Sequence, residues 1–195
     1  MKMLILNASP RKTGKVSQIL GAMEKRLKAD GHETEFVEVN GLDFKCCIGC
    51  MKCREKGDCI LPKDDAHRIG ASLKACDAIV VGSPVYWGNI SGKLKSLFDR
   101  QVALMMGESK MGIPIPLLKG KKALIVNACT TPFPLNILAG QSTKAYAAVK
   151  EILYYSGVKI KGKIMLAGTK NMQALKEISQ ILYQIAVAAK VILDL

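Results

Sequence analysis

The sequence predicts an α/β fold in which helices cover both faces of a five-stranded parallel sheet. Short apolar runs alternate with segments of helical periodicity along the chain, and this alternation is typical of right-handed βαβ units. Residues 78–82 form a continuous apolar run, as expected of a strand buried on both faces, and residues 123–129 repeat the pattern. Because the chain has 195 residues, of which 49% are hydrophobic, we expect one well-buried domain over residues 1–195.

In the first half of the chain, residues 2–8 are mostly apolar and end at a Ser-Pro-Arg turn, which predicts the first strand. Apolar residues recur at helical spacing over 16–27. Residues 34–39 alternate polar and apolar side chains and predict the second strand. An aspartate pair at 64–65 provides the cap of a helix that runs toward Cys76.

In the second half, Leu94, Leu97 and Phe98 share one face of a helix predicted over residues 91–103. The remaining elements are a helix over 142–155, a strand over 158–166 and a helix over 172–192. Five strands linked by crossover helices predict a flavodoxin-like three-layer α/β/α fold with strand order 2-1-3-4-5.

Composition restricts the location and the partners of the protein. The first apolar run is too short for a signal peptide, and no stretch approaches the roughly 20 apolar residues of a membrane helix. We therefore expect a cytoplasmic protein with no membrane partner. In that reducing compartment, an odd total of seven cysteines favours metal or redox use of the clustered ones.

We attribute the formal net charge of +13 first to lysine-rich helix faces that are exposed to solvent. It also favours anionic partners, such as an acidic electron-transfer protein or a phosphorylated cofactor. Nucleic acid is disfavoured, because the lysines are spread along the chain and one Trp, five Tyr and four Phe make a poor stacking platform.

Three loops are expected to converge at the carboxyl ends of the strands, where open parallel sheets bind ligands. The loop at 9–17 carries hydroxyls, positive charges and a helix N-terminus, which suit a phosphate. It is not a Walker loop, since Ser9 stands where that pattern needs Gly and Val16 follows Lys15. An ordinary solvated turn is the competing interpretation.

The loop at 84–89 places two aromatic rings and free backbone amides after a buried strand, which suits a planar ring such as a flavin. A role in the core or in an interface is the alternative. The loop at 129–131 supplies further hydroxyls and amides.

The segments at 7–12, 46–65, 82–89, 94–95 and 98–100 together resemble the flavodoxin-fold family of NAD(P)H-dependent FMN reductases. The cysteine spacing resembles the iron-sulfur flavoprotein branch of that family. The resemblance covers the chain from its start to about residue 100 and extends beyond only through the order of strands and helices. It implies non-covalently bound FMN and a homodimer or a dimer of dimers.

The resemblance also implies site residues. For the FMN phosphate they are Ser9, Arg11 and Ser17. Along the isoalloxazine ring they are Pro84, Val85, Tyr86, Trp87, Gly88 and Asn89, with Thr130 and Thr131 as further candidates. Lys15 and Val16 stand where the family commonly has Asn-Thr, so we expect the charge of Lys15 to replace one hydroxyl.

Four cysteines of the loop at 46–59 follow the spacing C-x2-C-x2-C-x5-C: Cys47, Cys50, Cys53 and Cys59. Four thiolates from one compact loop suit a four-iron four-sulfur cluster. A structural zinc site, a redox-active dithiol and a packed loop of free thiols remain alternatives. The resemblance favours the cluster, with Cys46 as a bystander.

The sequence thus predicts a flavoprotein oxidoreductase that uses FMN and electrons from NAD(P)H or ferredoxin to reduce a small-molecule acceptor. A non-enzymatic electron carrier or redox sensor is the alternative. His32 and His67 lie outside the predicted site loops and are expected at the surface. Residues 107–120 are a Gly- and Pro-containing excursion that we interpret as a flap or an oligomer contact.

Overall fold

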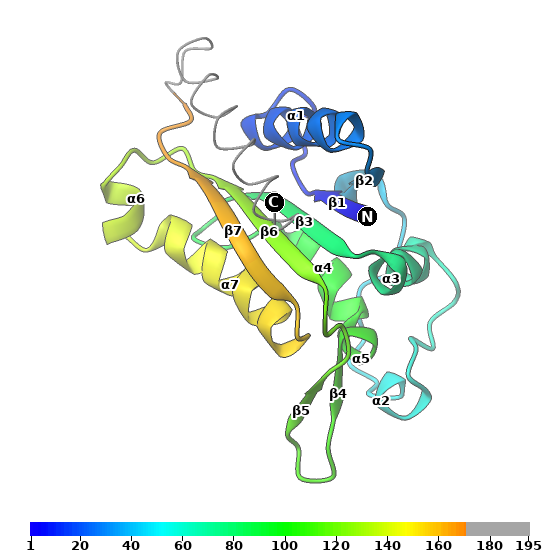
Figure 1. Cartoon of the computed structure of the whole chain (residues 1–195). Coiled ribbons are helices and arrows are strands. Elements are labelled where there is room, and N and C mark those ends of the chain that lie inside the picture. Colours follow the sequence, from blue (N-terminus) through cyan, green and yellow to red (C-terminus); the bar gives the residue numbers. More distant parts are fainter. Residues whose placement is uncertain (171–195) are drawn as a thin grey trace.

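The computed structural model of the chain describes residues 1–170 and contains a central five-stranded parallel sheet (Figure 1). Its strands are β1 (Lys2–Asn7), β2 (Glu33–Glu38), β3 (Ala78–Pro84), β6 (Lys122–Ala128) and β7 (Lys159–Leu166). Their order is β2-β1-β3-β6-β7, with every neighbouring pair parallel. Since β6 and β7 are the fourth and fifth strands of this sheet, the predicted order 2-1-3-4-5 is confirmed.

Two apolar layers, one on each face, fix the sheet between helices. The long helices are α1 (Lys15–Ala29), α3 (Asp65–Ala75), α4 (Gly92–Arg100) and α7 (Gln141–Tyr155). Alternate residues of β1 point to opposite faces, so Met3 and Ile5 pack against α1 while Leu4 and Leu6 pack in the cluster that includes α3, α4 and α7. The helix predicted over 172–192 lies outside the described residues.

The helix predicted over 91–103 divides into α4 and the short α5 (Val102–Met105) at Gln101. The Gln101 side chain is buried, and its Nε2 donates a hydrogen bond of 2.7 Å to the carbonyl oxygen of Ala66 in α3. The spacing of apolar residues carries no sign of this contact between helices. The sequence therefore predicts one continuous helix.

The excursion after α5 forms a two-stranded antiparallel hairpin of β4 (Met106–Glu108) and β5 (Pro114–Pro116). It extends away from the sheet in Figure 1. Three short helices complete the described chain: η1 (Val39–Gly41), α2 (Cys53–Lys56) and α6 (Leu135–Leu138). Within residues 1–170, no helix is long and apolar enough to cross a membrane.

Candidate functional site

The loop between β1 and α1 is shaped by the buried side chain of Asn7. Its Oδ1 accepts a hydrogen bond of 3.1 Å from the Ser9 N–H, and its Nδ2 donates one of 3.0 Å to Ser17 Oγ. The Ser17 hydroxyl in turn donates to the carbonyl oxygen of Arg11 at 2.8 Å. Ser17 therefore lies behind the loop and supports it. Ser9 is similarly buried, and its hydroxyl donates to the same carbonyl oxygen at 3.1 Å, whereas Arg11 is exposed.

Helix α1 begins directly after this loop without a side-chain cap. Gly14 is its N-cap, no side chain makes the capping hydrogen bond, and its first turn contains no acidic residue. The free N–H groups and the positive end of the helix dipole form a site suited to an anion. A Cβ on Gly14 would lie 3.0 Å from both Ser9 Oγ and the Arg11 carbonyl oxygen, so the tight turn favours glycine.

A cavity of about 180 Å³ opens where this loop meets the loops after β3 and β6. The three predicted loops thus converge. Its lining consists of Ser9, Arg11, Thr13, Gly14, Lys15, Val16, Pro84, Val85, Tyr86, Ala128, Thr130 and Thr169. Because the sequence predicts FMN on these three loops, we call it the flavin cavity from here on.

Four residues of this lining are additions to the sequence-based candidates. Thr13 and Gly14 lie within the loop already singled out, and Ala128 is the last residue of β6. Thr169 follows β7, and its N–H and hydroxyl both donate to the Cys129 carbonyl oxygen at 3.1 Å. No sequence signal marks Thr169, because its place depends on the pairing of β6 with β7.

A tight turn carries the aromatic pair that follows β3. The backbones of Tyr86 and Asn89 exchange two hydrogen bonds of 2.9 Å. Trp87 (φ 52°) and Gly88 (φ 70°) between them both have left-handed backbones, as in a type I′ turn. Such a conformation costs a bulky residue about 1–3 kcal/mol, and the Trp87 side chain is nonetheless fully exposed.

Several predicted residues are not part of the flavin cavity lining. They are Ser17, Trp87, Gly88, Asn89 and Thr131. The Thr131 hydroxyl instead donates to Gln141 Oε1 at 2.5 Å, at the start of α7.

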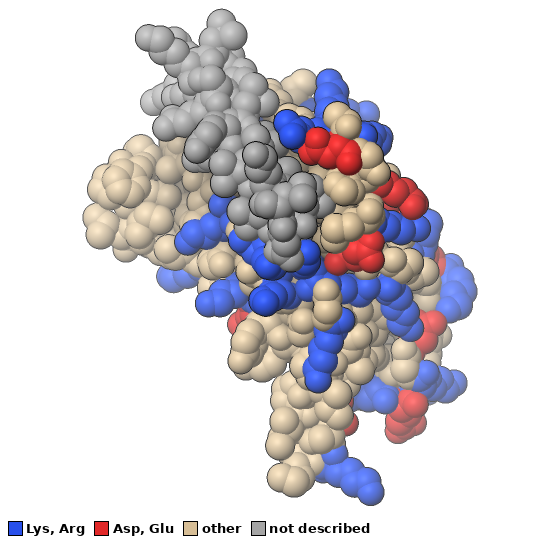
Figure 2. All heavy atoms as spheres, viewed as in Figure 1, with Lys and Arg blue, Asp and Glu red and all other residues tan. Residues whose placement is uncertain are grey.

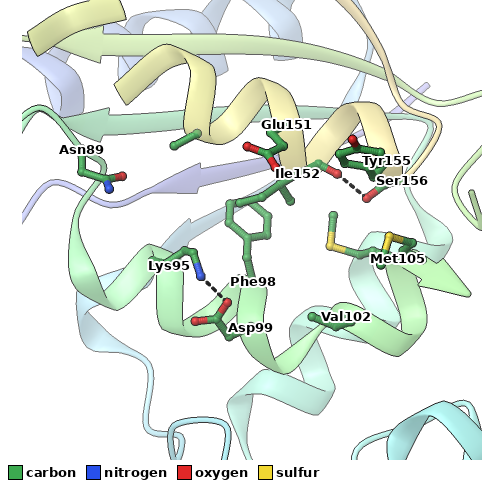
Figure 3. A pocket seen from close by; sticks show the side chains of 12 residues that line it. Asn89, Lys95, Phe98, Asp99, Val102, Met105, Glu151, Ile152, Tyr155 and Ser156 are labelled. Carbon is green, nitrogen blue, oxygen red and sulfur yellow. Dashed lines mark hydrogen bonds and ion pairs between the residues drawn. The ribbon is translucent and has the colours of Figure 1, made fainter. Parts of the chain in front are cut away.

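Asn89 lines a larger cavity of about 290 Å³ between α4 and α7 (Figure 3). Phe98 and Ile152 form part of its apolar wall, and the ion pair of Lys95 with Asp99 lies on the α4 side. This cavity adjoins the exposed turn, since Asn89 belongs to both.

The cysteine loop encloses a third cavity, also of about 180 Å³, which we call the cysteine cavity. All four predicted thiols line it, and Cys46 does not: its lining is Cys47, Ile48, Gly49, Cys50, Met51, Cys53, Arg54, Cys59, Leu61, Asp99, Arg100 and Val102. The thiols are free. In the part of the chain that the structure describes, no three His, Cys, Asp or Glu side chains are placed to hold a single metal ion.

The donor set of this cavity fits an iron-sulfur cluster, whose ligands are cysteine thiolates. Burial raises the pKa of the Cys53 thiol, and the neighbouring Cys59 raises it further. The charged form of Cys53 is therefore disfavoured unless a positively charged group compensates it.

Arg100, the last residue of α4, joins both ends of the cysteine loop. Its side chain is fully buried. Its Nη1 and Nη2 donate to the Asp64 carboxylate at 2.7 and 3.1 Å, its Nη1 also donates to the carbonyl oxygen of Lys45, and its Nε lies 3.2 Å from Cys59 Sγ. We call Arg100 and Asp64 together the clamp.

Asp64 is also the N-cap of α3, where it accepts from the Ala66 N–H at 3.1 Å. Burial alone would raise the pKa of its carboxyl group. Hydrogen bonds from Arg100, His67 and the Lys45 N–H outweigh burial and lower that pKa to about 2. Asp64 is therefore an anion over the whole physiological pH range.

The expectation that His67 lies at the surface is wrong. Only 9% of its side chain is exposed. Its Nδ1 lies 2.9 Å from Asp64 Oδ1, and its Nε2 lies 3.1 Å from the carbonyl oxygen of Cys59. The spacing of Asp64 and His67 is that of a capping box, which is the signal that could have placed this histidine.

Comparison with known proteins agrees with this geometry. A model of the family described as NADPH-dependent FMN reductase matches residues 1–152. An iron-sulfur flavoprotein of Archaeoglobus fulgidus is 37% identical over 111 residues, which are 57% of this chain and 54% of that protein. One from Methanocaldococcus jannaschii is 36% identical over 107 residues, 55% of each. The chain thus spans about half the length of these two relatives.

A third iron-sulfur flavoprotein, from Clostridioides difficile, is 27% identical over 180 residues, 91% of this chain and 72% of that protein. Among solved structures, an FMN-dependent NADH-azoreductase from Bacillus anthracis in complex with FMN has a TM-score of 0.77 at 15% identity, covering 97% of both chains. An NAD(P)H:quinone oxidoreductase from Methanothermobacter marburgensis has a TM-score of 0.73 at 20% identity, covering 97% of this chain and 94% of that one. At these identities the likeness establishes the fold.

Proposed function

Because the chain belongs to the family of NADPH-dependent FMN reductases, we propose that it is an oxidoreductase that uses FMN to pass electrons from NAD(P)H or a ferredoxin to a small-molecule acceptor. The flavin cavity carries this proposal. It lies at the carboxyl edge of the parallel sheet, where ligands of such folds bind. Bound FMN accepts a hydride as a two-electron unit and releases electrons singly.

The phosphate end of FMN is assigned to the loop before α1. The uncapped helix N-terminus offers backbone donors. Arg11 and Lys15 bring positive charge to the same cavity wall, and Ser9 brings a hydroxyl. Val16 lines the cavity with an apolar side chain, so Lys15 supplies attraction by charge at the position where a hydroxyl is missing.

The isoalloxazine ring is assigned to the loop after β3. The flavin cavity is smaller than the ~300–1,000 Å³ of pockets that enclose a whole drug-sized ligand. We therefore assign the phosphate and the ribityl chain to the cavity and the ring to the surface of the turn from Pro84 to Asn89, beside Trp87. Thr130, in the loop after β6, lines the same cavity.

We further propose that Cys47, Cys50, Cys53 and Cys59 hold a four-iron four-sulfur cluster. Support comes from their common cavity and from relatives whose names include iron-sulfur. A cluster moves one electron at a time. Beside a flavin, it would let electrons from a two-electron donor pass singly to a one-electron partner.

Two kinds of partner are proposed. Lys and Arg outnumber Asp and Glu over the face seen in Figure 2, in accord with the net charge of +13, which favours an acidic ferredoxin. A second copy of the chain, forming a homodimer or a dimer of dimers, is favoured by exposed apolar residues on the β4–β5 hairpin, among them Met111, Ile113 and Ile115. Sedimentation velocity of the purified chain measures the latter directly.

The experiment is an FMN titration followed by steady-state oxidation of NADH and NADPH with a quinone, a nitro compound or free flavin as acceptor. We expect stoichiometric FMN uptake and turnover with at least one acceptor. Uptake of FMN without turnover would favour the alternative, a non-enzymatic electron carrier or redox sensor. A chain that ignores FMN at micromolar concentration would overturn the proposal.

A further inference from the structure

Arg100 makes more contacts than a structural ion pair needs. Removing a guanidinium from water costs several kcal/mol, which is offset only if its donors are satisfied. The Asp64 carboxylate satisfies two of the Arg100 nitrogens, and the Lys45 carbonyl oxygen accepts from one of them. The remaining nitrogen, Nε, points to the sulfur of Cys59.

That fourth contact joins a strong donor to an acceptor whose strength depends on its state. A neutral thiol sulfur accepts hydrogen bonds weakly, whereas a thiolate bound to a cluster carries negative charge. Arg100 Nε lies 3.2 Å from Cys59 Sγ. The hydrogen bond between them is thus strongest when Cys59 is a cluster ligand.

We propose that Arg100 is a positioning residue that raises the reduction potential of the cluster by donating a charged hydrogen bond to Cys59 Sγ. This inference rests on the proposed cluster. Reduction adds one electron, and so one negative charge, to the cluster and its four thiolates. Hydrogen bonds to the sulfurs stabilise the more negative state and raise the potential.

The contacts also make the cluster environment asymmetric. The Gly49 N–H donates to Cys47 Sγ at 3.4 Å, a longer bond from an uncharged donor. The donor to Cys59 is shorter and charged, and such hydrogen bonds are about twice as strong as neutral ones. A cluster held by these thiols would therefore receive its strongest stabilisation of negative charge from Arg100, at Cys59.

The test compares reduction potentials after anaerobic reconstitution with iron and sulfide. Wild type, Arg100→Gln and Arg54→Gln are titrated with a chemical reductant and followed by the electron paramagnetic resonance of the reduced cluster. Arg54 lines the same cavity and pairs with Glu108, so its variant removes the same charge without touching the Cys59 contact. Arg100→Gln leaves Asp64 without its partner, so the double variant Asp64→Asn/Arg100→Gln is made in parallel.

We expect Arg100→Gln and the double variant to lower the equilibrium constant for one-electron reduction about tenfold, which is about 59 mV. Asp64→Asn alone and Arg54→Gln should change it less than threefold. Clusters with unchanged potential in both Arg100 variants would overturn the inference while leaving the cluster in place. Loss of the cluster from both, with FMN uptake intact, would reduce Arg100 to a structural clamp and equally overturn it. A wild-type protein that binds no iron and sulfide would overturn the proposed cluster and this inference together.

Discussion

The flavin cavity and the cysteine cavity have the same volume of about 180 Å³, but different contacts hold them. Around the flavin cavity, Asn7, Ser9 and Ser17 form hydrogen bonds between residues two to ten positions apart, and Asn7 Nδ2 also donates to the Glu38 carboxylate at 2.8 Å, 31 positions away. Around the cysteine cavity, the buried ion pair of Arg100 with Asp64 joins residues 36 positions apart. The contacts of Arg100 with Cys59 and with Lys45 join residues 41 and 55 positions apart. The loop before α1 is thus held mainly by local hydrogen bonds with one contact to the end of β2, whereas the cysteine cavity depends on the packing of α4 against the rest of the chain.

This difference has a chemical counterpart. The loop before α1 offers donors that need no ionisation, because backbone N–H groups and a guanidinium are ready for an anion. The cysteine cavity offers thiols that must lose protons before they bind iron. We therefore expect the two sites to respond separately to substitution.

The largest effect is expected for Cys50→Ser. Removing one of four thiolate ligands should abolish stoichiometric cluster binding while FMN uptake stays at the wild-type level. Iron and sulfide analysis after anaerobic purification measures this. Cys46→Ser is the matched control, since Cys46 does not line the cavity, and it should retain wild-type iron. Equal iron content in both variants would refute the ligand assignment.

Next in size is Arg11→Ala in the loop before α1. Loss of a charged hydrogen bond to the phosphate, about 1.5–3 kcal/mol, should weaken FMN binding by about 10- to 100-fold. Quenching of flavin fluorescence gives the affinity. Lys12→Ala is the control, since it removes a neighbouring charge that does not line the flavin cavity. If both variants bind FMN equally well, the phosphate end does not lie at Arg11.

A smaller effect is expected for Asp64→Asn in the cluster-free protein. The folded-state pKa of about 2 lies below the ordinary value of 3.8. The ionised carboxylate therefore stabilises the fold above the unfolded pKa, and this contribution is lost as pH falls from about 5 toward 2. Discounted for solvent screening, it amounts to about 1–2 kcal/mol of the free energy of unfolding at pH 7.

Urea unfolding of wild type and Asp64→Asn at several pH values, followed by circular dichroism, tests this expectation. The difference between the two proteins should shrink as pH is lowered. Asp30→Asn, which removes an exposed partner of Arg26 in α1, should cost at most about 0.5 kcal/mol. A difference for Asp64→Asn that does not vary with pH would contradict the role of ionisation.

The smallest effect is expected at the turn after β3. Asn adopts a left-handed backbone more readily than Trp, so Trp87→Asn should stabilise the flavin-free protein by about 0.5–1 kcal/mol. Gly88→Ala should destabilise it by a similar amount, because Gly88 also has positive φ. Thermal unfolding of the two variants and of wild type measures both changes in stability. A stabilised Trp87→Asn protein with weaker FMN binding would indicate that the strain at Trp87 serves the flavin.

The fold was largely predictable because its strands are marked by apolar runs and its ligand loops follow from strand order. The apolar runs at residues 78–82 and 123–129 predict buried strands. Because these strands are parallel, the loops that follow them lie at the same edge of the sheet. One missed feature depends on a contact between distant segments, and another on strands too short to give a sequence pattern. Gln101 ends α4 through a bond to α3, and the hairpin after α5 has only two three-residue strands.

The candidate sites show the same limit. Spacing alone identified four thiols, and the structure brings them to one cavity. Spacing could not identify Arg100, because its contacts with Asp64 and Cys59 require α4 to lie against the cysteine loop. For His67, by contrast, the capping-box spacing with Asp64 was available in the sequence and was not used.

Helix α4 runs from the end of the loop after β3 to the cysteine cavity. Its N-cap, Ser91, donates its N–H to Ser83 Oγ near the end of β3, and its last residue is Arg100. Nine helical residues at 1.5 Å each measure about 14 Å, so this helix is a spacer of fixed length between the loop after β3 and the cysteine cavity. Inserting one residue would turn its far end by about 100°. The length and phase of this single helix therefore set whether a guanidinium faces the cysteines at all.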